Sequence, residues 1–100
     1  MSPESSPSSQ NETQIIVRYW ASARAATGVN EDRLSTDGTL SISDVRDRVL
    51  ALHPDSDNLE RVVASCSVLV DDEPLGRRDP STVLVSPGQS VEFLPPFAGG

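Results

Sequence analysis

The most informative segment of the sequence is the end of the chain, residues 91–100, which reads VEFLPPFAGG. Val91–Leu94 is typical of a β-strand, and the two prolines after it predict where that strand ends, because proline fixes φ and has no amide N–H to donate. The last two residues are glycines, which have no side chain and adopt backbone angles closed to other residues. We therefore expect residues 95–100 to form a narrow arm that extends about 20 Å beyond the strand.

The other end of the chain has a different composition. Residues 1–14 are mostly Ser, Pro, Glu, Gln, Asn and Thr, with no apolar periodicity. Such a segment buries too little apolar surface to offset the entropy lost on ordering. The sequence therefore predicts a disordered tail at 1–14, one folded domain at 15–94 and the extended arm at 95–100.

Composition narrows the classes of partner and compartment. The chain has 100 residues, 15 acidic and 8 basic, and a formal net charge of −7. This charge makes a nucleic acid an improbable partner and favours a protein with a basic surface. No apolar run is long enough to span a membrane, and a lone cysteine excludes an internal disulfide framework. We expect a cytoplasmic protein that binds no membrane, and no grouping of residues has the spacing of a metal site.

Strands and helices alternate along the predicted domain. The β-branched and aromatic segments predict strands, at residues 15–20, 31–35, 66–70, 82–85 and 91–94. A short helix is expected at 22–27, closed by Gly28 in a left-handed conformation, and a further helical turn at 59–64. The segments 71–74 and 86–89 are predicted turns, the second of type II because of its Pro-Gly pair.

The main helix is predicted at Ile42–His53. Ser41 can cap its N-terminus in a capping box with Asp44, and the proline after His53 ends it. Apolar residues recur at three- and four-residue spacing and predict one buried stripe, made of Ile42, Val45, Val49 and Leu52.

The order of these elements predicts an α+β domain with a mixed four- to five-stranded sheet and one main helix packed on one face. If the first and last strands are parallel neighbours, the connection between them must contain the helix. The first strand has apolar residues at both alternating positions, among them Ile16 and Trp20. One of its faces would then remain available as a hydrophobic surface for a partner.

These features together resemble the β-grasp, or ubiquitin-like, fold, and within it the small sulfur-carrier subunits of molybdopterin synthase. The resemblance covers residues 15–100, and its most specific part is the ending of hydrophobic strand, Pro-Pro, small apolar residues and Gly-Gly. Trp20-Ala21 occupies the place of a Phe-Ala pair in that family, and Arg24 the place of its arginine. Asp71 stands where an asparagine is common.

The resemblance implies how the arm would be used. An E1-like enzyme would adenylate the Gly100 carboxylate with ATP, and a sulfurtransferase would then supply sulfur to give a thiocarboxylate. The large catalytic subunit of molybdopterin synthase would take in the arm, and the sulfur would pass to a pterin precursor. The chain itself would bind no cofactor and would not be catalytic alone. The residues that the resemblance assigns to partner binding are Pro95, Pro96, Phe97, Ala98 and Gly99.

Three alternatives remain open at this point. The same chemistry could serve thiamine or cysteine biosynthesis. The chain could be a protein modifier whose Gly100 forms isopeptide bonds, although it has no lysine and so cannot form lysine-linked chains with itself. It could also be a non-covalent binding module, which would not need a free Gly-Gly end.

Cys66 begins an apolar strand and is expected to be a small buried residue rather than a nucleophile.

Overall fold

The computed structural model describes residues 13–96, so most of the predicted N-terminal tail and the last four residues, Phe97, Ala98, Gly99 and Gly100, lie outside the described part. Gln14, which we assigned to the tail, is instead the first residue of a strand and pairs with Ser35. The folded domain therefore begins at least one residue earlier than the sequence predicted.

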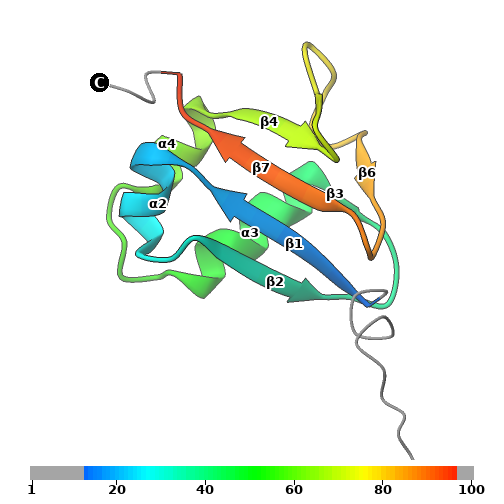
Figure 1. The fold of residues 1–100 in the computed structure, drawn as a ribbon, viewed down its shortest axis with the longest axis horizontal. Helices are drawn as coiled ribbons and strands as arrows, with labels where there is room; N and C mark the ends of the chain where they lie inside the picture. Colours follow the sequence, from blue (N-terminus) through cyan, green and yellow to red (C-terminus); the bar gives the residue numbers. More distant parts are fainter. Residues whose placement is uncertain (1–12, 97–100) are drawn as a thin grey trace, which may run out of the picture.

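A five-stranded mixed sheet forms the centre of the molecule, in the order β2-β1-β7-β4-β5 (Figure 1). Its strands are β1 (Gln14–Tyr19), β2 (Glu31–Ser35), β4 (Ser67–Val70), β5 (Glu73–Pro74) and β7 (Ser90–Leu94). The first and last strands are parallel neighbours, as predicted, and the other pairs are antiparallel.

Three helices lie on the same side of this sheet (Figure 1). They are α2 (Ala21–Thr27), α3 (Ile42–Leu52) and α4 (Leu59–Ser65). The connection between the parallel strands contains all three, in agreement with the expected crossover. Within residues 13–96, none of the helices has the length and apolar character needed to cross a membrane.

Local sequence signals set the ends of these elements. The hydroxyl of Ser41 accepts a hydrogen bond from the Asp44 amide at 3.0 Å, and the Ser41 amide donates to the Asp44 carboxylate at 3.2 Å, which confirms the capping box. Gly28 closes α2 at φ 80°, and Gly88 has φ 95° in the turn before β7. Such positions favour glycine, so the two glycines were sufficient to predict the end of α2 and the turn before β7.

Two predicted strand and turn boundaries were wrong. The predicted strand 82–85 is reduced to β6 (Leu84–Val85), which pairs with β3 (Leu40–Ser41) in a separate small sheet. It begins late because the Thr82 amide donates to the Asp79 carbonyl in a preceding turn. The turn predicted at 71–74 is shorter in the structure. Asp71 and Asp72, both with positive φ, complete it, and Glu73–Pro74 forms β5.

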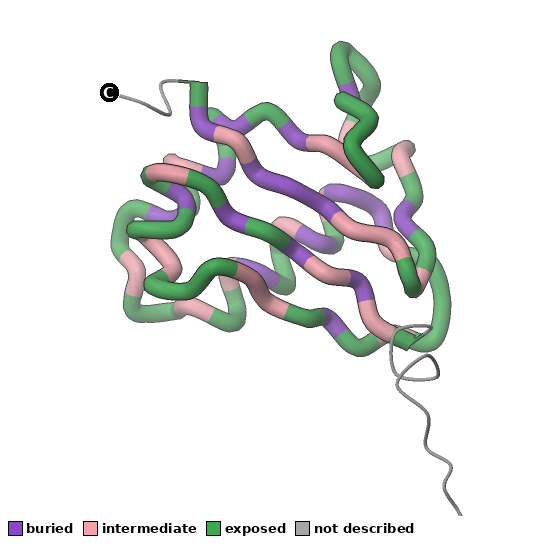
Figure 2. The backbone as a smooth tube through the Cα atoms, viewed as in Figure 1, coloured by how far each residue is buried: buried purple, intermediate pink, exposed green. Residues whose placement is uncertain are grey.

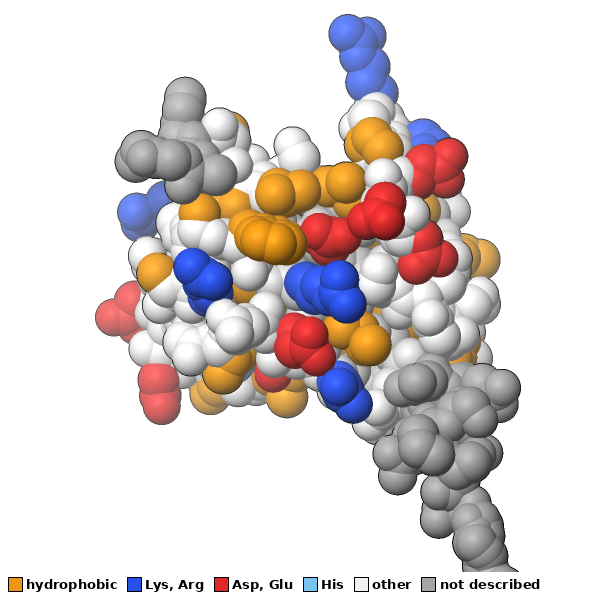
Figure 3. All heavy atoms as spheres, viewed as in Figure 1, with side chains coloured by type: hydrophobic (Ala, Val, Ile, Leu, Met, Phe, Trp, Pro, Cys, Tyr) orange, Lys and Arg blue, Asp and Glu red, His pale blue; other side chains and the backbone are white. Residues whose placement is uncertain are grey.

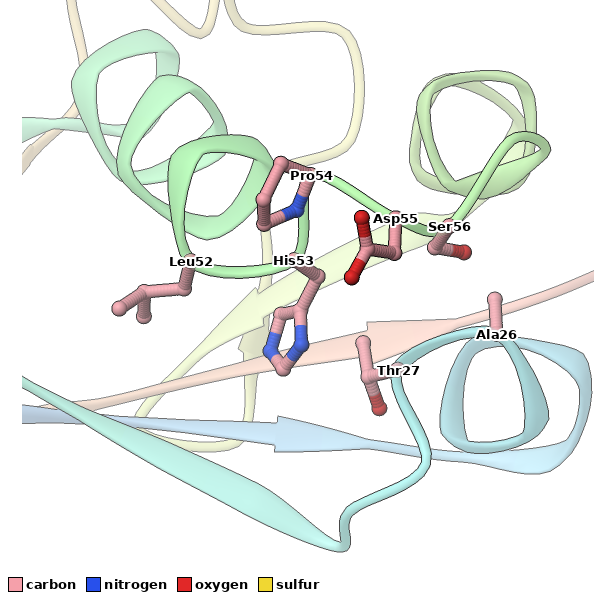
Figure 4. Close-up of a pocket in the computed structure, with 7 residues that line it drawn as sticks. All are labelled: Ala26, Thr27, Leu52, His53, Pro54, Asp55 and Ser56. Atoms are coloured by element: carbon pink, nitrogen blue, oxygen red, sulfur yellow. The ribbon is translucent and has the colours of Figure 1, made fainter.

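The core lies between the sheet and the helices. Buried residues alternate with less buried ones along β1, whereas Val91, Glu92 and Phe93 form one continuous buried segment on β7 (Figure 2). Ile42, Val45 and Val49 are fully buried on α3. Leu52, the fourth member of the predicted stripe, is 49% exposed. It is the last residue of α3 and projects sideways from the helix end (Figure 4). Helical periodicity predicts which side chains of α3 face the sheet, but it cannot show how far along the helix the sheet extends beneath it.

Candidate functional site: the sheet edge where the arm begins

The C-terminal arm begins at one edge of the sheet, where three strand ends meet. β7 runs parallel to β1, and the amide of Trp20 donates to the Phe93 carbonyl at 3.3 Å. On its other side β7 is antiparallel to β4, so that Leu94 pairs with Ser67. Pro95 is buried and Pro96 is exposed, as the last described residue. The described chain thus ends two residues after β7, whose Phe93 carbonyl is bonded to the Trp20 amide.

A tryptophan and a glutamate make the most distinctive contact near this exit. Trp20 follows β1 and is 44% exposed, whereas Glu92, on β7, is only 8% exposed. The Trp20 indole N–H donates to the Glu92 carboxylate at 3.0 Å. A hydrogen bond to a charged acceptor is stronger than a neutral one, and here it restrains the orientation of an exposed aromatic ring. Such a ring is the kind of residue that dominates protein interfaces.

The surface around Trp20 is the outer face of the sheet, on the side opposite the helices. Hydrophobic side chains gather over β7 and β4 on this face, with charged side chains over β1 and β2 (Figure 3). Arg18 and Arg33 both lie within ion-pair distance of Glu31, at 3.9 and 3.5 Å. The predicted hydrophobic face of the first strand is therefore mixed, because Arg18 interrupts the apolar positions. An apolar centre with a charged rim is the usual anatomy of a non-obligate interface.

Arg24 lies beside this face. It is exposed on α2 and, with Trp20, Asn30 and Glu31, lines a shallow cavity of about 260 Å³. The structure thus brings the Trp20 and Arg24 positions, which the resemblance singled out, to the same edge as the start of the arm. The short helix α2 does not cover the outer face, since it packs its buried Ala23 on the core side.

A second cavity, of about 330 Å³, lies between the end of α3 and α2 and is lined by His53, Pro54 and Thr27 among others (Figure 4). The His53 ring turns away from the helix, and its Nε2 lies 2.5 Å from a carboxylate oxygen of Asp32. The Tyr19 hydroxyl donates to the same oxygen at 2.8 Å. We had expected the His53 side chain to serve the last carbonyls of α3. Its ring instead joins α3 to β2, and only its amide donates within the helix end.

Cys66 has the properties of a buried structural residue. It is 8% exposed at the C-terminal end of α4, just before β4, rather than within a strand. Burial raises the pKa of its thiol to about 11, against a smaller opposite effect of the Arg46 charge. The thiol is therefore protonated at neutral pH and is a poor nucleophile. Among residues 13–96, no three His, Cys, Asp or Glu side chains are grouped so that they could hold a metal ion.

The turn that leads into β7 is held by Asp71. Its carboxylate accepts hydrogen bonds from the Ser90 amide and from the Gln89 side chain, both at 2.9 Å. These bonds, that of the Ser90 amide foremost, lower the pKa of Asp71. Asp71 itself has φ 49°. Aspartate and asparagine both tolerate this conformation, so the departure from the family pattern noted at this position keeps the same backbone role.

Glu92 was not predicted as a site residue. Its alternation with Val91 and Phe93 placed it on the outer face, where a glutamate is unremarkable. Only the pairing of β7 with β1 brings it beneath Trp20. Of the predicted partner-binding residues, Pro95 and Pro96 lie at the exit described above. Phe97, Ala98, Gly99 and the predicted reactive Gly100 lie outside the described residues, so these assignments stay predictions.

Sequence comparison identifies the family. The model of the ThiS family matches residues 17–100 of this chain. The chain belongs to the ThiS family. Two relatives have the name molybdopterin synthase sulfur carrier subunit. The one from Chlamydomonas reinhardtii is 29% identical over 87% of this chain and 99% of its own length. The one from Aspergillus niger (strain ATCC MYA-4892 / CBS 513.88 / FGSC A1513) is 30% identical over 88% of this chain and 96% of its own length.

Solved structures give the same fold. Small archaeal modifier protein 1 of Haloferax volcanii matches with a TM-score of 0.69 and 20% identity, over 87% of this chain and 99% of that one. A chain in the complex of subunits 1 and 2 of the molybdopterin-converting factor from Helicobacter pylori 26695 matches with a TM-score of 0.56 and 16% identity, over 87% of this chain and 99% of that one. These likenesses confirm the predicted α+β, ubiquitin-like β-grasp fold.

Proposed function

We propose that this protein is the sulfur-carrier subunit of a molybdopterin synthase and that its reactive group is the C-terminal carboxylate of Gly100. The observation that supports this best is the family match through residue 100, together with the two relatives of that name that align over nearly their whole length. The arm that would deliver the sulfur starts at a sheet edge where an oriented tryptophan offers a docking point.

The chemistry requires activation, because a carboxylate is an unreactive anion at neutral pH. An oxygen of the Gly100 carboxylate would attack the α-phosphate of ATP in an E1-like partner, with pyrophosphate as the leaving group. A sulfur nucleophile supplied by a sulfurtransferase would then form a bond to the acyl carbon and displace AMP. Adenylation thus divides one difficult substitution into two easier steps. The resulting thiocarboxylate would donate its sulfur to the pterin precursor.

In this proposal the large subunit of the synthase binds the outer face of the sheet and takes in residues 95–100. The matching chain of the Helicobacter pylori structure comes from a complex of two such subunits, which supports this arrangement. The apolar area around Trp20 would supply the contact, with the charges of Arg18 and Glu31 at its rim. Because this chain has a net charge of −7, we expect its association rate to fall as salt rises.

Gly100→Ala tests the reactive end. A methyl group next to the reacting carbon should displace it in a channel that fits glycine, and a small displacement of this kind can cost about 10²-fold in rate. We expect thermal unfolding to be unchanged and sulfur transfer by the reconstituted synthase to be lost. Intact mass measured after incubation with ATP, an activating enzyme and a sulfur donor should show one oxygen replaced by sulfur in the wild type. Transfer by Gly100→Ala at the wild-type rate would reject the proposal.

A protein modifier is the second candidate, because the matched Haloferax volcanii structure is that of a small archaeal modifier protein. Both functions begin with the same adenylate and differ in the nucleophile that follows. The two functions can be distinguished by recovering the tagged chain from its own cells under denaturing conditions and identifying what is attached to Gly100. Isopeptide-linked conjugates that end in Gly100 would favour the modifier, and free chain with a thiocarboxylate would favour the carrier.

A further inference from the structure

A third cavity lies away from the outer face, at the far edge of β4 and next to the loop that follows β5. Its volume is about 400 Å³, the largest of the three cavities described here. Its walls combine three arginines with apolar side chains, in particular Arg46, Arg77, Arg78, Val68, Leu75 and Pro80. Arg46 comes from α3, and the other two arginines come from the loop.

The charge of this cavity is opposite to that of the chain. The net charge is −7 with eight arginines in all, yet three of the eight line this one cavity and none of its lining residues is acidic. Over residues 13–96, the ion pairs that the structure contains involve Arg18, Arg33 and His53. Within the described residues, no carboxylate therefore forms an ion pair with the arginines of the cavity.

Arg46 carries the clearest sign of an unfilled interaction. Its side-chain Nε is shielded from solvent and has no hydrogen-bond partner, the one buried side-chain nitrogen or oxygen in the described residues with this property. A buried donor without a partner costs free energy, and a polar group that entered the cavity and reached Arg46 would relieve that cost.

Arg78, which lines the same cavity, is held in place by two hydrogen bonds. Its Nε donates to the Leu75 carbonyl and its Nη2 to the Pro74 carbonyl, both at 3.1 Å. These two bonds fix the guanidinium and leave its other N–H groups free to donate. Gly76 lies between Leu75 and Arg78 on the loop. It has φ 62° and no atom within 4 Å of where a Cβ would stand, so the loop backbone is open to an incoming group. Basic side chains over this loop stand clear of the body (Figure 3).

The rest of the lining adds no negative charge. Cys66 lines the same cavity, and the raised pKa of its thiol keeps it neutral. Val68, Leu75 and Pro80 supply apolar surface next to the guanidinium groups. The cavity therefore offers a cationic end and an apolar wall.

We propose that this cavity binds a small organic phosphate, with the phosphate on Arg46 and Arg78 and the carbon part against Val68, Leu75 and Pro80. A guanidinium fork matches two oxygens of a tetrahedral oxyanion. A phosphate ester, with a charge of about −1.5 to −2 at neutral pH, balances several arginines better than one carboxylate does. The site is separate from the outer face, so the inference does not depend on the proposed sulfur transfer.

The test is a titration of the ¹⁵N-labelled full-length protein with phenyl phosphate at constant ionic strength, followed by amide and arginine Nε–H signals. We expect saturable shifts at Ser67, Gly76, Arg78 and the Arg46 Nε–H, and none on β1 or β2. Arg46→Gln and Arg78→Gln should each weaken binding at least about tenfold, since a hydrogen bond to a charged group contributes that much. Arg61→Gln is the matched control, because Arg61 is an exposed arginine on α4 outside the cavity.

Each alternative outcome has a defined meaning. Inorganic phosphate that binds as tightly as phenyl phosphate would reject the role of the apolar wall. Benzoate or an acidic peptide that binds more tightly than phenyl phosphate would assign the cavity to a carboxylate and reject the phosphate proposal. Shifts that do not saturate, or an equal loss of binding in Arg61→Gln, would show only general attraction of anions to arginine and would overturn the proposal. Because Arg78 lies on a loop, its variant keeps the test valid if Arg46→Gln fails to fold.

Discussion

The inner and outer faces of the sheet differ along the same strands. Val91 and Phe93 point to the helices and are fully buried, whereas Glu92 between them points outward and binds an exposed tryptophan. On β1, Val17 is fully buried and its neighbour Arg18 is exposed within ion-pair distance of Glu31. A step of one residue along a strand thus separates a side chain packed in the core from one on the outer face of the sheet. Substitutions on one face should change stability, and those on the other should change partner binding.

The largest effect is expected on the inner face, at Phe93. It is fully buried and stacks on Tyr19 with ring centroids 6.3 Å apart. Phe93→Ala should lower the free energy of unfolding by about 3–5 kcal/mol through lost burial and a new cavity. Urea unfolding measures this, and Phe93→Leu offers a milder step if the alanine variant does not fold. Leu94→Ala, on the outward-facing neighbour, should cost less than half as much. Equal losses at both positions would contradict the division between the faces.

The next effect concerns the thiol of Cys66. Burial raises its pKa from the ordinary 9.0 to about 11. Below both values, the thiolate fraction is therefore about 10²-fold smaller than for an exposed cysteine, and alkylation by iodoacetamide should slow in proportion. The measurement compares the native protein with the protein in concentrated urea at about pH 8. Native alkylation as fast as that of the unfolded chain would show that Cys66 is accessible and reactive.

On the outer face, Trp20→Ala should weaken binding of the large synthase subunit by about 2 kcal/mol, roughly 30-fold, as loss of a central aromatic anchor does. The variant's melting temperature should also fall, because the Glu92 carboxylate, 8% exposed, loses its hydrogen bond from the indole. Trp20→Phe keeps an aromatic ring but loses the hydrogen bond to Glu92, so an intermediate affinity would assign part of the effect to ring orientation. Arg33→Gln, also on the outer face but on β2, is the control. Unchanged affinity in Trp20→Ala, measured by calorimetry, would remove Trp20 from the interface.

The smallest effect is a pH-dependent one at Asp71, which follows β4 and accepts hydrogen bonds from Gln89 and Ser90 at the start of β7. Hydrogen bonds lower its pKa below the ordinary 3.8. The ionised carboxylate therefore stabilises the fold at pH values above 3.8, and this contribution is lost as the pH falls through the lower, folded value. Asp71→Asn should lower the melting temperature by no more than about 4 °C at neutral pH. The difference should vanish in acid. Asp72→Asn is the matched control, and a difference that stays the same as the pH is lowered would contradict this account.

Signals within a few residues predicted the local structure well. The Ser41–Asp44 capping box, the left-handed Gly28 and the turn at Gly88 are all present. Each depends on contacts or backbone angles within a few residues, so the chain carries the information locally. Leu52 was predicted buried and is exposed because its environment depends on how far the sheet extends beneath α3, which no local pattern contains.

The sequence was enough to predict the α+β class, the main helix with its cap, the end of the last strand at the two prolines and the family resemblance of the last ten residues. These properties follow from side-chain periodicity and from the backbone limits of proline and glycine. Only the tertiary structure decided that Glu92 lies under Trp20, 72 positions apart along the chain, and that Arg46 meets the loop of Arg78 in one cavity. The physical reason is that strand pairing and helix packing set such contacts, and both join residues whose separation in sequence has no period to detect.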